Sequence, residues 1–229
     1  MRPVEPSVEL ISRPKIDWEE ITAYLEEVGG TAWSDRVRDQ ESPDSEDLLE
    51  FAGRMCYRSW EPGLNPNVGR VRTDSTQYLG NVVASQHGSV LEHASYTFIL
   101  HNVSRVFTHE LIRHRAGAAY SQESLRYVRL EDIPFWFPEW AREDEELMKR
   151  SLDLLDRMEE HQKWMSEHFG LDEEGQNFTH KKHMTSFMRR FAPEGLATGI
   201  VFTANLRTLR HVIEMRTAKG AEEEIRLVF

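Results

Sequence analysis

Apolar residues recur at helical spacing along most of this chain, so helices are expected to dominate the fold. The longest such segment, residues 141–168, is highly charged but places Met148, Leu152 and Leu155 on one stripe, as an amphipathic helix does. The expected helices cover residues 17–27, 45–57, 75–84, 104–114, 141–168, 178–190 and 205–215. One more helix is expected to begin near residue 221. Because the chain stops at Phe229 soon afterwards, we expect a truncated C-terminal helix.

Between these helices lie segments enriched in β-branched and aromatic residues, which favour strands. They cover residues 94–101, 125–130 and 196–203. Residues 1–15 are polar and contain three prolines, so we expect an extended N-terminal arm, followed by a single domain over residues 16–229. Strands and helices do not alternate regularly, and the pattern therefore predicts an α/β or α+β domain rather than a doubly wound parallel sheet.

Composition narrows the class of protein. With 229 residues, the chain is long enough for a core that needs no disulfide or metal. It has no apolar run of about 20 residues to span a bilayer and no signal-peptide core. Its one cysteine, Cys56, cannot form an internal disulfide, which fits a reducing compartment. These features predict a cytoplasmic protein with no membrane partner.

The charge distribution bears on the ligand. A net charge of −11 argues against a nucleic-acid partner, which usually requires a basic surface. Acids crowd residues 17–50 and 141–174, whereas residues 105–129 are rich in arginine and poor in acids. Because arginine binds phosphate and carboxylate groups bidentately, this distribution indicates a small anionic ligand. Pairing of the arginines with the surplus acids is the alternative, and composition alone favours it.

Helical wheels single out two of the arginines. In the helix over 205–215, Arg216 projects toward the apolar stripe instead of the polar face. Arg115 does the same at the end of the helix over 104–114. A buried guanidinium needs a carboxylate, a carbonyl or a ligand. An internal salt bridge, or a wheel that no longer holds at a helix end, would explain either residue alone. Two together, with Arg126 nearby, favour a shared anion site.

Residues 113–127 form the most specific motif, Arg-His-Arg-Ala-Gly-Ala-Ala-Tyr-Ser-Gln-Glu-Ser-Leu-Arg-Tyr. This motif resembles the signature of the flavin-dependent thymidylate synthases, which runs Arg-His-Arg, seven residues, Ser, and an Arg two positions later. Here eight residues separate Arg115 from Ser124. The loop therefore carries one extra residue, which we place within residues 116–119.

Further blocks are similar to this family in the same order over residues 45–229. Residues 87–93 resemble its His-x-Ser/Thr-x-x-Glu-His segment, and residues 189–193 its Arg-x-x-x-Pro element. Residues 205–216 resemble its Asn-x-Arg helix, with His211 where the family often has Asn. Ordered blocks with matching spacing are specific, whereas a lone Arg-His-Arg is not.

The resemblance implies a single catalytic domain with a central, mostly antiparallel sheet flanked by helices, and a homotetramer whose active sites are shared between subunits. It also implies reductive methylation of dUMP to dTMP with methylenetetrahydrofolate, FAD and NADPH, without an enzyme nucleophile. The residues that it assigns to FAD are His87, Ser89, Glu92, Arg113, His114, Arg115, Glu123, Asn205, Arg207 and His211. Those that it assigns to dUMP are Glu110, Arg113, Glu123, Ser124, Leu125, Arg126, Arg189 and Arg216.

The candidate catalytic residues are Arg216 and Ser124. Arg216 is expected to stabilise negative charge on a uracil carbonyl oxygen. Ser124 has no His-Asp arrangement to activate it, so we expect it to hydrogen-bond a phosphate or ribose. Cys56 lies in an apolar run and is expected to be a buried structural thiol.

Other cofactor sites are not indicated. No Cys-His cluster or His-Glu-x-x-His pattern predicts a metal, and no Gly-x-Gly-x-x-Gly motif predicts a Rossmann-type site. His180 and His183, with two lysines between them, are expected on a solvated helix face, a folate or subunit contact being the alternative.

Three alternative functions remain open at this point. A non-catalytic nucleotide-binding protein would bind FAD without forming dTMP. A nucleic-acid binder would show strongly salt-dependent affinity. A flavin reductase or oxidase would consume NADPH without needing dUMP.

Overall fold

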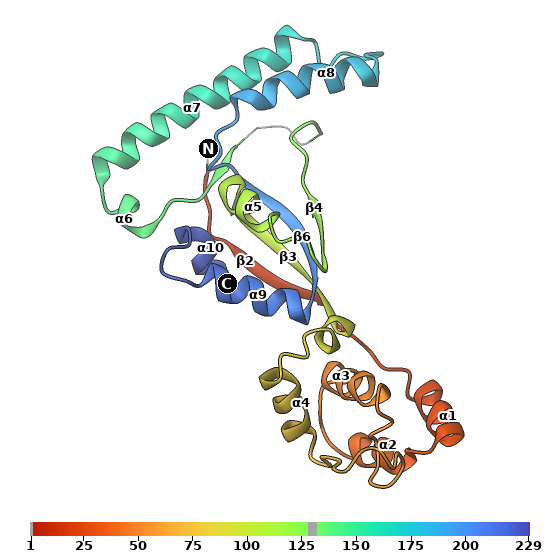
Figure 1. The fold of residues 1–229 in the computed structure, drawn as a ribbon. Coiled ribbons are helices and arrows are strands. Elements are labelled where there is room, and N and C mark those ends of the chain that lie inside the picture. The colour runs from red at the N-terminus through yellow and green to blue at the C-terminus, as the bar shows by residue number, and fades with distance from the viewer. Residues whose placement is uncertain (1, 128–131) are drawn as a thin grey trace.

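The computed structural model describes residues 2–127 and 132–229. The helices are α1 (Trp18–Val28), α2 (Thr31–Arg38), α3 (Asp44–Met55), α4 (Ser75–Ala84), α5 (Arg105–Leu111), α6 (Glu139–Arg142), α7 (Glu145–His168), α8 (Phe178–Met188), α9 (Leu206–Arg216) and α10 (Glu223–Val228). Short 3-10 helices are η1 (Val90–His93) and η2 (Arg189–Phe191). The strands are β1 (Arg2–Pro3), β2 (Ser7–Ser12), β3 (Ser95–Ser104), β4 (Ala118–Gln122), β5 (Pro134–Phe135) and β6 (Ala197–Asn205). Figure 1 shows helices α1–α4 at one end of an elongated molecule, a sheet in the middle, and the pair α7–α8 at the other end.

The centre of the molecule is a four-stranded antiparallel sheet in the order β2-β3-β6-β4. The middle strands, β3 and β6, place Phe98 opposite Phe202 and coincide with the strands expected over 94–101 and 196–203. A separate parallel pair joins β1 to β5. The prediction of a central, mostly antiparallel sheet flanked by helices is therefore confirmed.

The strand expected over 125–130 is wrong where it can be checked. Residues 125–127 form a turn, and residues 128–130 lie outside the described part of the chain. The edge strand is instead β4, in the small-residue segment taken for a loop. Ala118 and Tyr120 pack against the core, so pairing with β6 and burial outweigh the low strand propensity of alanine.

The N-terminal region holds two further differences from expectation. Residues Ser7–Ser12 of the expected arm form β2, an edge strand that places Val8 opposite Leu100 of β3. The helix α2, which had not been expected, begins directly after the glycines that end α1. It adds Trp33 to an aromatic cluster with Trp60. The assignment of residues 16–229 to a single domain stays a prediction.

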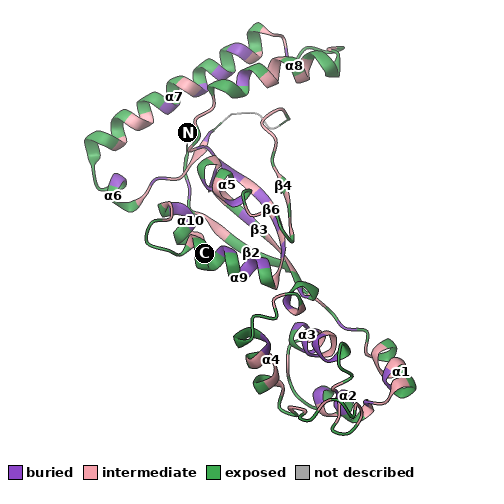
Figure 2. Ribbon diagram, in the orientation of Figure 1, coloured by how far each residue is buried: buried purple, intermediate pink, exposed green. Residues whose placement is uncertain are grey.

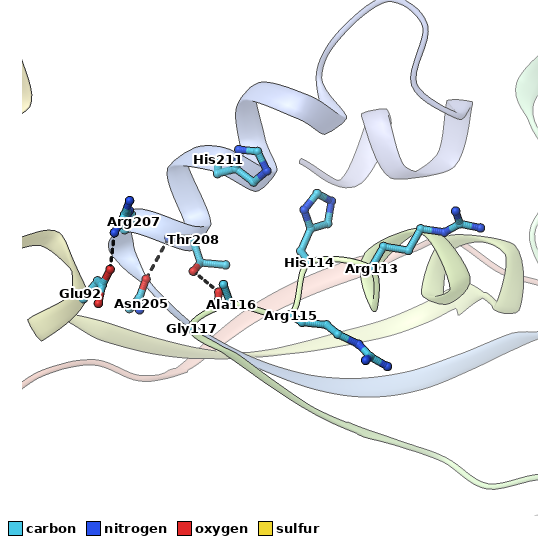
Figure 3. Close-up of a pocket in the computed structure, with 10 residues that line it drawn as sticks. All are labelled: Glu92, Arg113, His114, Arg115, Ala116, Gly117, Asn205, Arg207, Thr208 and His211. Atoms are coloured by element: carbon cyan, nitrogen blue, oxygen red, sulfur yellow. Dashed lines mark hydrogen bonds and ion pairs between the residues drawn. The ribbon is translucent and has the colours of Figure 1, made fainter. Parts of the chain in front are cut away.

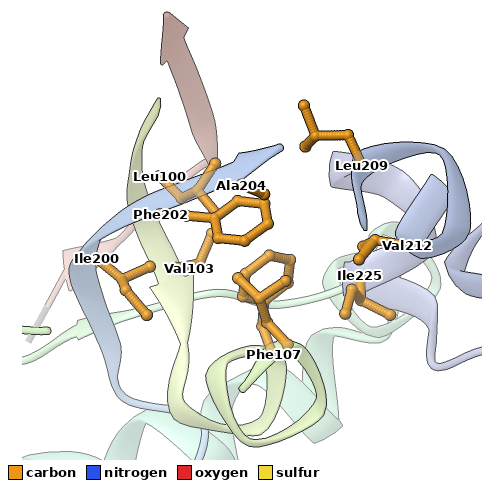
Figure 4. Close-up of a cluster of buried hydrophobic side chains, with 10 residues drawn as sticks. Leu100, Val103, Phe107, Ile200, Phe202, Ala204, Leu209, Val212 and Ile225 are labelled. Carbon is orange, nitrogen blue, oxygen red and sulfur yellow. The ribbon is translucent and has the colours of Figure 1, made fainter. Parts of the chain in front are cut away.

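The main core lies between one face of the sheet and the helices α5, α9 and α10 (Figure 4). Leu100 and Phe202 from the sheet meet Phe107 of α5, Val212 of α9 and Ile225 of α10, and each of these side chains is nearly fully buried. Burial of each contributes roughly 1.5–3 kcal/mol to stability. This packing fixes both site-bearing helices, α5 and α9, against the sheet.

The topology brings distant segments together at the end of α5. Ser104 Oγ caps α5 by accepting from Phe107 N at 3.0 Å, and Asn205 Oδ1 caps α9 by accepting from Thr208 N at 2.9 Å. Because β3 and β6 are antiparallel, the two helices start at opposite ends of the sheet and cross the same face. The chain leaving α5 over residues 113–117 therefore meets the start of α9.

The pair α7–α8 is much more exposed than the sheet region, as Figure 2 shows by the scattered buried positions along α7. A compact cluster of Met165, Leu171 and Met188 holds the two helices together. Large apolar side chains nevertheless remain exposed on them, including Leu154, Trp164, Phe178 and Phe187.

Candidate functional site

A cavity of about 730 Å³ opens between η1, α9 and the segment that follows α5 (Figure 3). Its lining residues are Glu92, Arg113, His114, Arg115, Ala116, Gly117, Asn205, Arg207, Thr208 and His211. All of them except Ala116, Gly117 and Thr208 belong to the set that sequence analysis assigned to FAD. The fold thus gathers residues from three separate sequence blocks around one space.

The loop after α5 is tied to the start of α9 by hydrogen bonds. Thr208 Oγ1 donates to Ala116 O at 2.5 Å, and Asn205 N donates to Gly117 O at 3.1 Å. Gly117 has φ +67°, and a Cβ there would lie 2.3 Å from Asn205 Nδ2. Only glycine fits this backbone and this approach. The loop with the extra residue is therefore held tightly at residues 116 and 117.

Positive charge predominates in the cavity. Arg113, Arg115 and Arg207 line it with a single carboxylate, Glu92. The Arg207 Nη1 lies 2.5 Å from Glu92 Oε1, and both side chains are largely exposed, so this pair adds little stability but orients Arg207 across the opening. Leu206 N and Thr208 N already donate to Ala94 O and Asn205 Oδ1, so the N-terminus of α9 adds mainly the positive end of the helix dipole. The site is suited to an anionic ligand such as a pyrophosphate.

Arg216 is partly buried, as its helical wheel predicted, with a side chain 14% exposed. Its Nη1 contacts Glu110 Oε2, its Nη2 donates to Glu110 O at 2.7 Å, and its Nε donates to His114 Nε2 at 2.8 Å. Arg115, by contrast, is exposed, so the prediction that it is buried is wrong. Because α5 ends at Leu111, the wheel does not extend to residue 115.

His114 links Arg216 to the cavity. Because the Arg216 Nε always carries a proton, His114 Nε2 must be the acceptor, which places the histidine proton on Nδ1. Burial lowers the pKa of His114, and the nearby Arg216 and His211 lower it further, against a smaller raising effect of Glu110. The His114 and His211 rings meet edge to face at 5.6 Å. His114 is therefore a neutral donor beside the cationic wall.

The remaining candidate nucleotide residues are dispersed. Ser124 and Leu125 begin the turn that follows β4, where Arg126 N donates to Ser124 Oγ at 3.4 Å. Arg189 is exposed at the start of η2. The Glu123 carboxylate accepts from Gly199 N at 2.9 Å, which directs it toward β6. None of these residues lines the large cavity.

A smaller cavity of about 170 Å³ surrounds Arg126 and is lined also by Tyr127, Phe178, Lys181 and Lys182. The Arg126 Nε is buried without a hydrogen-bond partner among the described residues. The sequence predicts the two lysines on a solvated face, so their place beside this cavity is not anticipated from it. Their spacing from Phe178 was the available signal, because residues three and four apart share a helix face.

Three other expectations can be checked. His180 and His183 are exposed, which confirms that they lie on a solvated face. Cys56 is exposed, so the prediction of a buried thiol is wrong, because α3 ends one residue earlier at Met55. His87 and Ser89 are exposed just before η1 and do not line the large cavity.

Within residues 2–127 and 132–229, no group of three or more His, Cys, Asp and Glu side chains is arranged to hold a metal ion. In the same part of the chain, no helix combines the length and apolar character needed to cross a membrane.

Known proteins resemble this chain in both sequence and fold. Residues 39–229 match the family described as thymidylate synthase complementing protein. A flavin-dependent thymidylate synthase of Mycolicibacterium gilvum is 37% identical over 190 residues, which cover 78% of this chain and 70% of the relative. One from Corynebacterium efficiens is 33% identical over 237 residues, covering 99% and 83%.

Solved structures share the fold at lower identity. Thymidylate synthase X from Helicobacter pylori, crystallised with FAD and dUMP, has a TM-score of 0.55 and 22% identity, covering 81% of this chain and 84% of that one. The UMP/dUMP methylase PolB from Streptomyces cacaoi has a TM-score of 0.64 and 16% identity, covering 99% and 87%. From the family match and the identities over most of its length, the chain belongs to the flavin-dependent thymidylate synthase family.

Proposed function

We propose that this protein methylates dUMP to dTMP, with methylenetetrahydrofolate as the carbon donor and FAD, reduced by NADPH, as the hydride carrier. The observation that carries the proposal is the convergence of the Arg-His-Arg segment and the start of α9 on one cationic cavity. The sequence relatives are named for this activity. A cytoplasmic location is part of the same proposal.

The donor set of the large cavity fits FAD. Arg113, Arg115 and Arg207 supply guanidinium groups for the pyrophosphate, and the start of α9 supplies the positive end of its dipole. The volume of about 730 Å³ lies within the range of cofactor sites. When bound, FAD supplies the hydride that completes the new methyl group. We keep His87, Ser89 and Glu123 in the FAD set, although none of them lines the large cavity. His87 and Ser89 would contact a part of FAD that extends outside the cavity, and Glu123 orders the junction of β4 and β6.

Arg216 is the residue that we assign to activation of the uracil ring. Its guanidinium has five N–H donors, of which the contacts to Glu110 and His114 use three. The two that remain, one on each Nη, can donate to a uracil carbonyl oxygen and stabilise the charge that develops there. Glu110 fixes the direction of the guanidinium, so we assign it a positioning role as well as a place beside dUMP.

The nucleotide phosphate is assigned to the second group of residues. Ser124 offers a hydroxyl, and Arg126 a guanidinium whose Nε has no partner among the described residues. Arg189 contributes a further exposed cation. These residues do not share a cavity with Arg216 in one chain. We therefore propose that dUMP binds where two subunits meet.

A homotetramer with shared active sites would supply that meeting. Exposed apolar side chains on α7 and α8, such as Trp164 and Phe187, are suited to subunit contact. Sedimentation of the purified protein tests this part of the proposal, and a monomer that retains full activity would contradict it.

Visible spectroscopy tests the function directly. A flavin band in the purified protein, or after addition of FAD, should bleach when NADPH is added anaerobically. With dUMP present, methylenetetrahydrofolate should then restore the band while dTMP forms. Bleaching without dTMP would favour the reductase alternative, and a flavin band that NADPH does not bleach would favour the non-catalytic one.

A further inference from the structure

A second cavity is lined by the same short segment, residues 87–92, that lines the cavity assigned to FAD. It has a volume of about 320 Å³ and lies between α3, α4 and the loop over residues 57–72. His87 lines it, whereas Glu92, on the η1 turn that follows, lines the large cavity. Gly88 stands between the two: a Cβ at Gly88 would lie 2.9 Å from Arg207 Nε. The two cavities therefore lie on either side of residues 87–92, and a ligand that reaches past this segment contacts both.

The uncompensated charge in this second cavity is positive. Arg70 and Arg72 line it, and the lining contains no Asp or Glu. Neither arginine forms an ion pair within residues 2–127 and 132–229. Arg54 also lines the cavity, but Glu50 neutralises it at 2.7 Å. The two unpaired guanidinium groups leave the cavity suited to carboxylate or phosphate groups.

The loop that carries these arginines is held in place by the core. Arg54 is fully buried, and it donates to Ser59 O at 2.7 Å and to Arg72 O at 2.6 Å, one at each end of the loop. Asn65 Nδ2 donates to Tyr57 O at 2.6 Å and ties the middle of the loop to its start. A preformed wall loses little conformational entropy when a ligand binds.

An aromatic surface completes the second cavity. Tyr57 lines it and is 61% exposed, so its ring can stack on a flat ligand group. A ring followed by two carboxylates matches one exposed tyrosine and two unpaired arginines. In the proposed reaction, the co-substrate with this chemistry is the folate, whose aminobenzoyl ring carries a glutamate.

We propose that the second cavity binds the aminobenzoyl-glutamate tail of the folate co-substrate. Arg70 and Arg72 bind the glutamate carboxylates, and Tyr57 packs against the ring. The inference rests on the proposed function, because it requires a folate that reacts in the neighbouring cavity.

The test replaces both arginines, as Arg70→Gln with Arg72→Gln. Loss of charge-assisted hydrogen bonds should raise the KM for methylenetetrahydrofolate about 10- to 100-fold. The kcat and the KM values for dUMP and NADPH should not change. Arg150→Gln is the matched control, because Arg150 is 79% exposed and pairs with Glu146 on α7.

A binding measurement shows whether the arginines contact the glutamate tail or the pterin ring system of the folate. By calorimetry, tetrahydrofolate should bind the double variant about 10- to 100-fold more weakly than the wild type. Tetrahydropteroate, which lacks the glutamate, should bind both proteins equally.

Equal affinity of both proteins for tetrahydrofolate would overturn the proposal. A rise in the KM for NADPH alone would also overturn it and would assign the arginines to a nucleotide phosphate. If the wild type forms dTMP and the variant behaves identically, only this inference fails. If the wild type forms no dTMP, the proposed function fails.

Discussion

Arg54 and Arg216 each pair with a glutamate, but one pair lies in the core and the other lies beside the candidate site. Each lies near the C-terminal end of a helix and contacts a glutamate. Arg54 is fully buried, its three nitrogens donate to Glu50, Ser59 O and Arg72 O, and its face lies 4.1 Å from the centre of the Tyr78 ring. Although Arg54 lines the second cavity, its side chain is only 1% exposed.

Arg216 differs in that a ligand can reach its guanidinium. It is 14% exposed, lies beside a cavity-lining histidine and keeps two N–H donors without a partner among the described residues. An arginine with almost no exposed surface stabilises the fold, whereas one with spare donors on an exposed edge can bind a ligand. The comparison predicts that loss of Arg54 affects mainly stability and that loss of Arg216 affects mainly catalysis.

The largest expected effect is that of Arg54→Met on stability. The change leaves Glu50 buried without its cation and two loop carbonyls without their donor, and removal of one partner of a buried pair costs about 3–5 kcal/mol. Urea unfolding of the FAD-free protein measures this loss. Arg13→Met, at an exposed position, is the control and should change stability by less than about 0.5 kcal/mol.

A second substitution tests whether the unpaired charge of Glu50 causes most of the lost stability. Adding Glu50→Gln to Arg54→Met removes the stranded charge and keeps an acceptor for Trp33 Nε1, which donates to Glu50 Oε1 at 2.8 Å. The double variant should recover part of the lost stability. If it is less stable than Arg54→Met alone, the uncompensated charge of Glu50 is not the main cost.

Arg216→Ala should produce the largest effect on catalysis. Loss of a preorganised donor to the developing charge typically lowers kcat by about 10²–10³-fold. Steady-state formation of dTMP, together with dUMP affinity, measures the effect. Arg210→Ala, an exposed position on the same helix, should retain full activity. Intact dUMP binding and turnover in Arg216→Ala would refute our assignment of Arg216.

The contrast also explains how far the sequence predicts this site. Arg216 was found because α9 is helical to its last residue, so its wheel holds. Arg54 was not singled out, since an arginine in an apolar run gives no sign of the loop carbonyls that it will meet. The separation of Arg126 from Arg216 could not be predicted either, because it depends on how the sheet spaces β4 from α9.

In the sheet, too, the strands with a clear local sequence pattern were predicted, and the strand that depends on tertiary pairing was not. The central strands β3 and β6 were predicted from their β-branched and aromatic residues, and they pair with each other in the middle of the sheet. The strand β4 was missed because Ala118 and Ala119 become strand residues only by pairing with β6. Helix α2 was missed because two glycines preceding it signal the end of a helix as strongly as they permit the start of another.

Gly117→Ala tests whether the backbone of the loop at residue 117 shapes the FAD cavity. The new Cβ would lie 2.3 Å from Asn205 Nδ2 at a φ of +67°, so the loop must shift from the cavity wall. Strain of this kind costs about 1–3 kcal/mol, and we expect FAD affinity to fall on the order of tenfold. Flavin fluorescence during titration of the FAD-free protein measures it.

The matched control for that change is Gly63→Ala. Gly63 also has a positive φ, +86°, but a Cβ there meets no atom within 4 Å. It carries the backbone strain without the collision and lies outside the FAD cavity. If Gly63→Ala weakens FAD binding as much as Gly117→Ala, the effect reports general destabilisation and not the shape of the loop.

A pH dependence of stability is expected from Asp47 in helix α3, the helix that carries Arg54. Burial raises the pKa of Asp47 from 3.8 to about 6, against the lowering effect of the hydrogen bond from Ser42 Oγ at 2.6 Å. Between these values the folded protein binds more protons than the unfolded chain, so the Asp47 contribution to stability is present below pH 3.8 and is lost as pH rises through 6.

Asp47→Asn, which keeps an acceptor for Ser42, should remove this dependence. Relative to the wild type, the unfolding free energy of Asp47→Asn should therefore increase between pH 4 and pH 7, while Glu41→Gln, at an exposed position, should leave the profile unchanged. If the Asp47→Asn and wild-type profiles stay parallel, Asp47 is ionised in the folded protein throughout this range, and its burial costs less than its surroundings indicate.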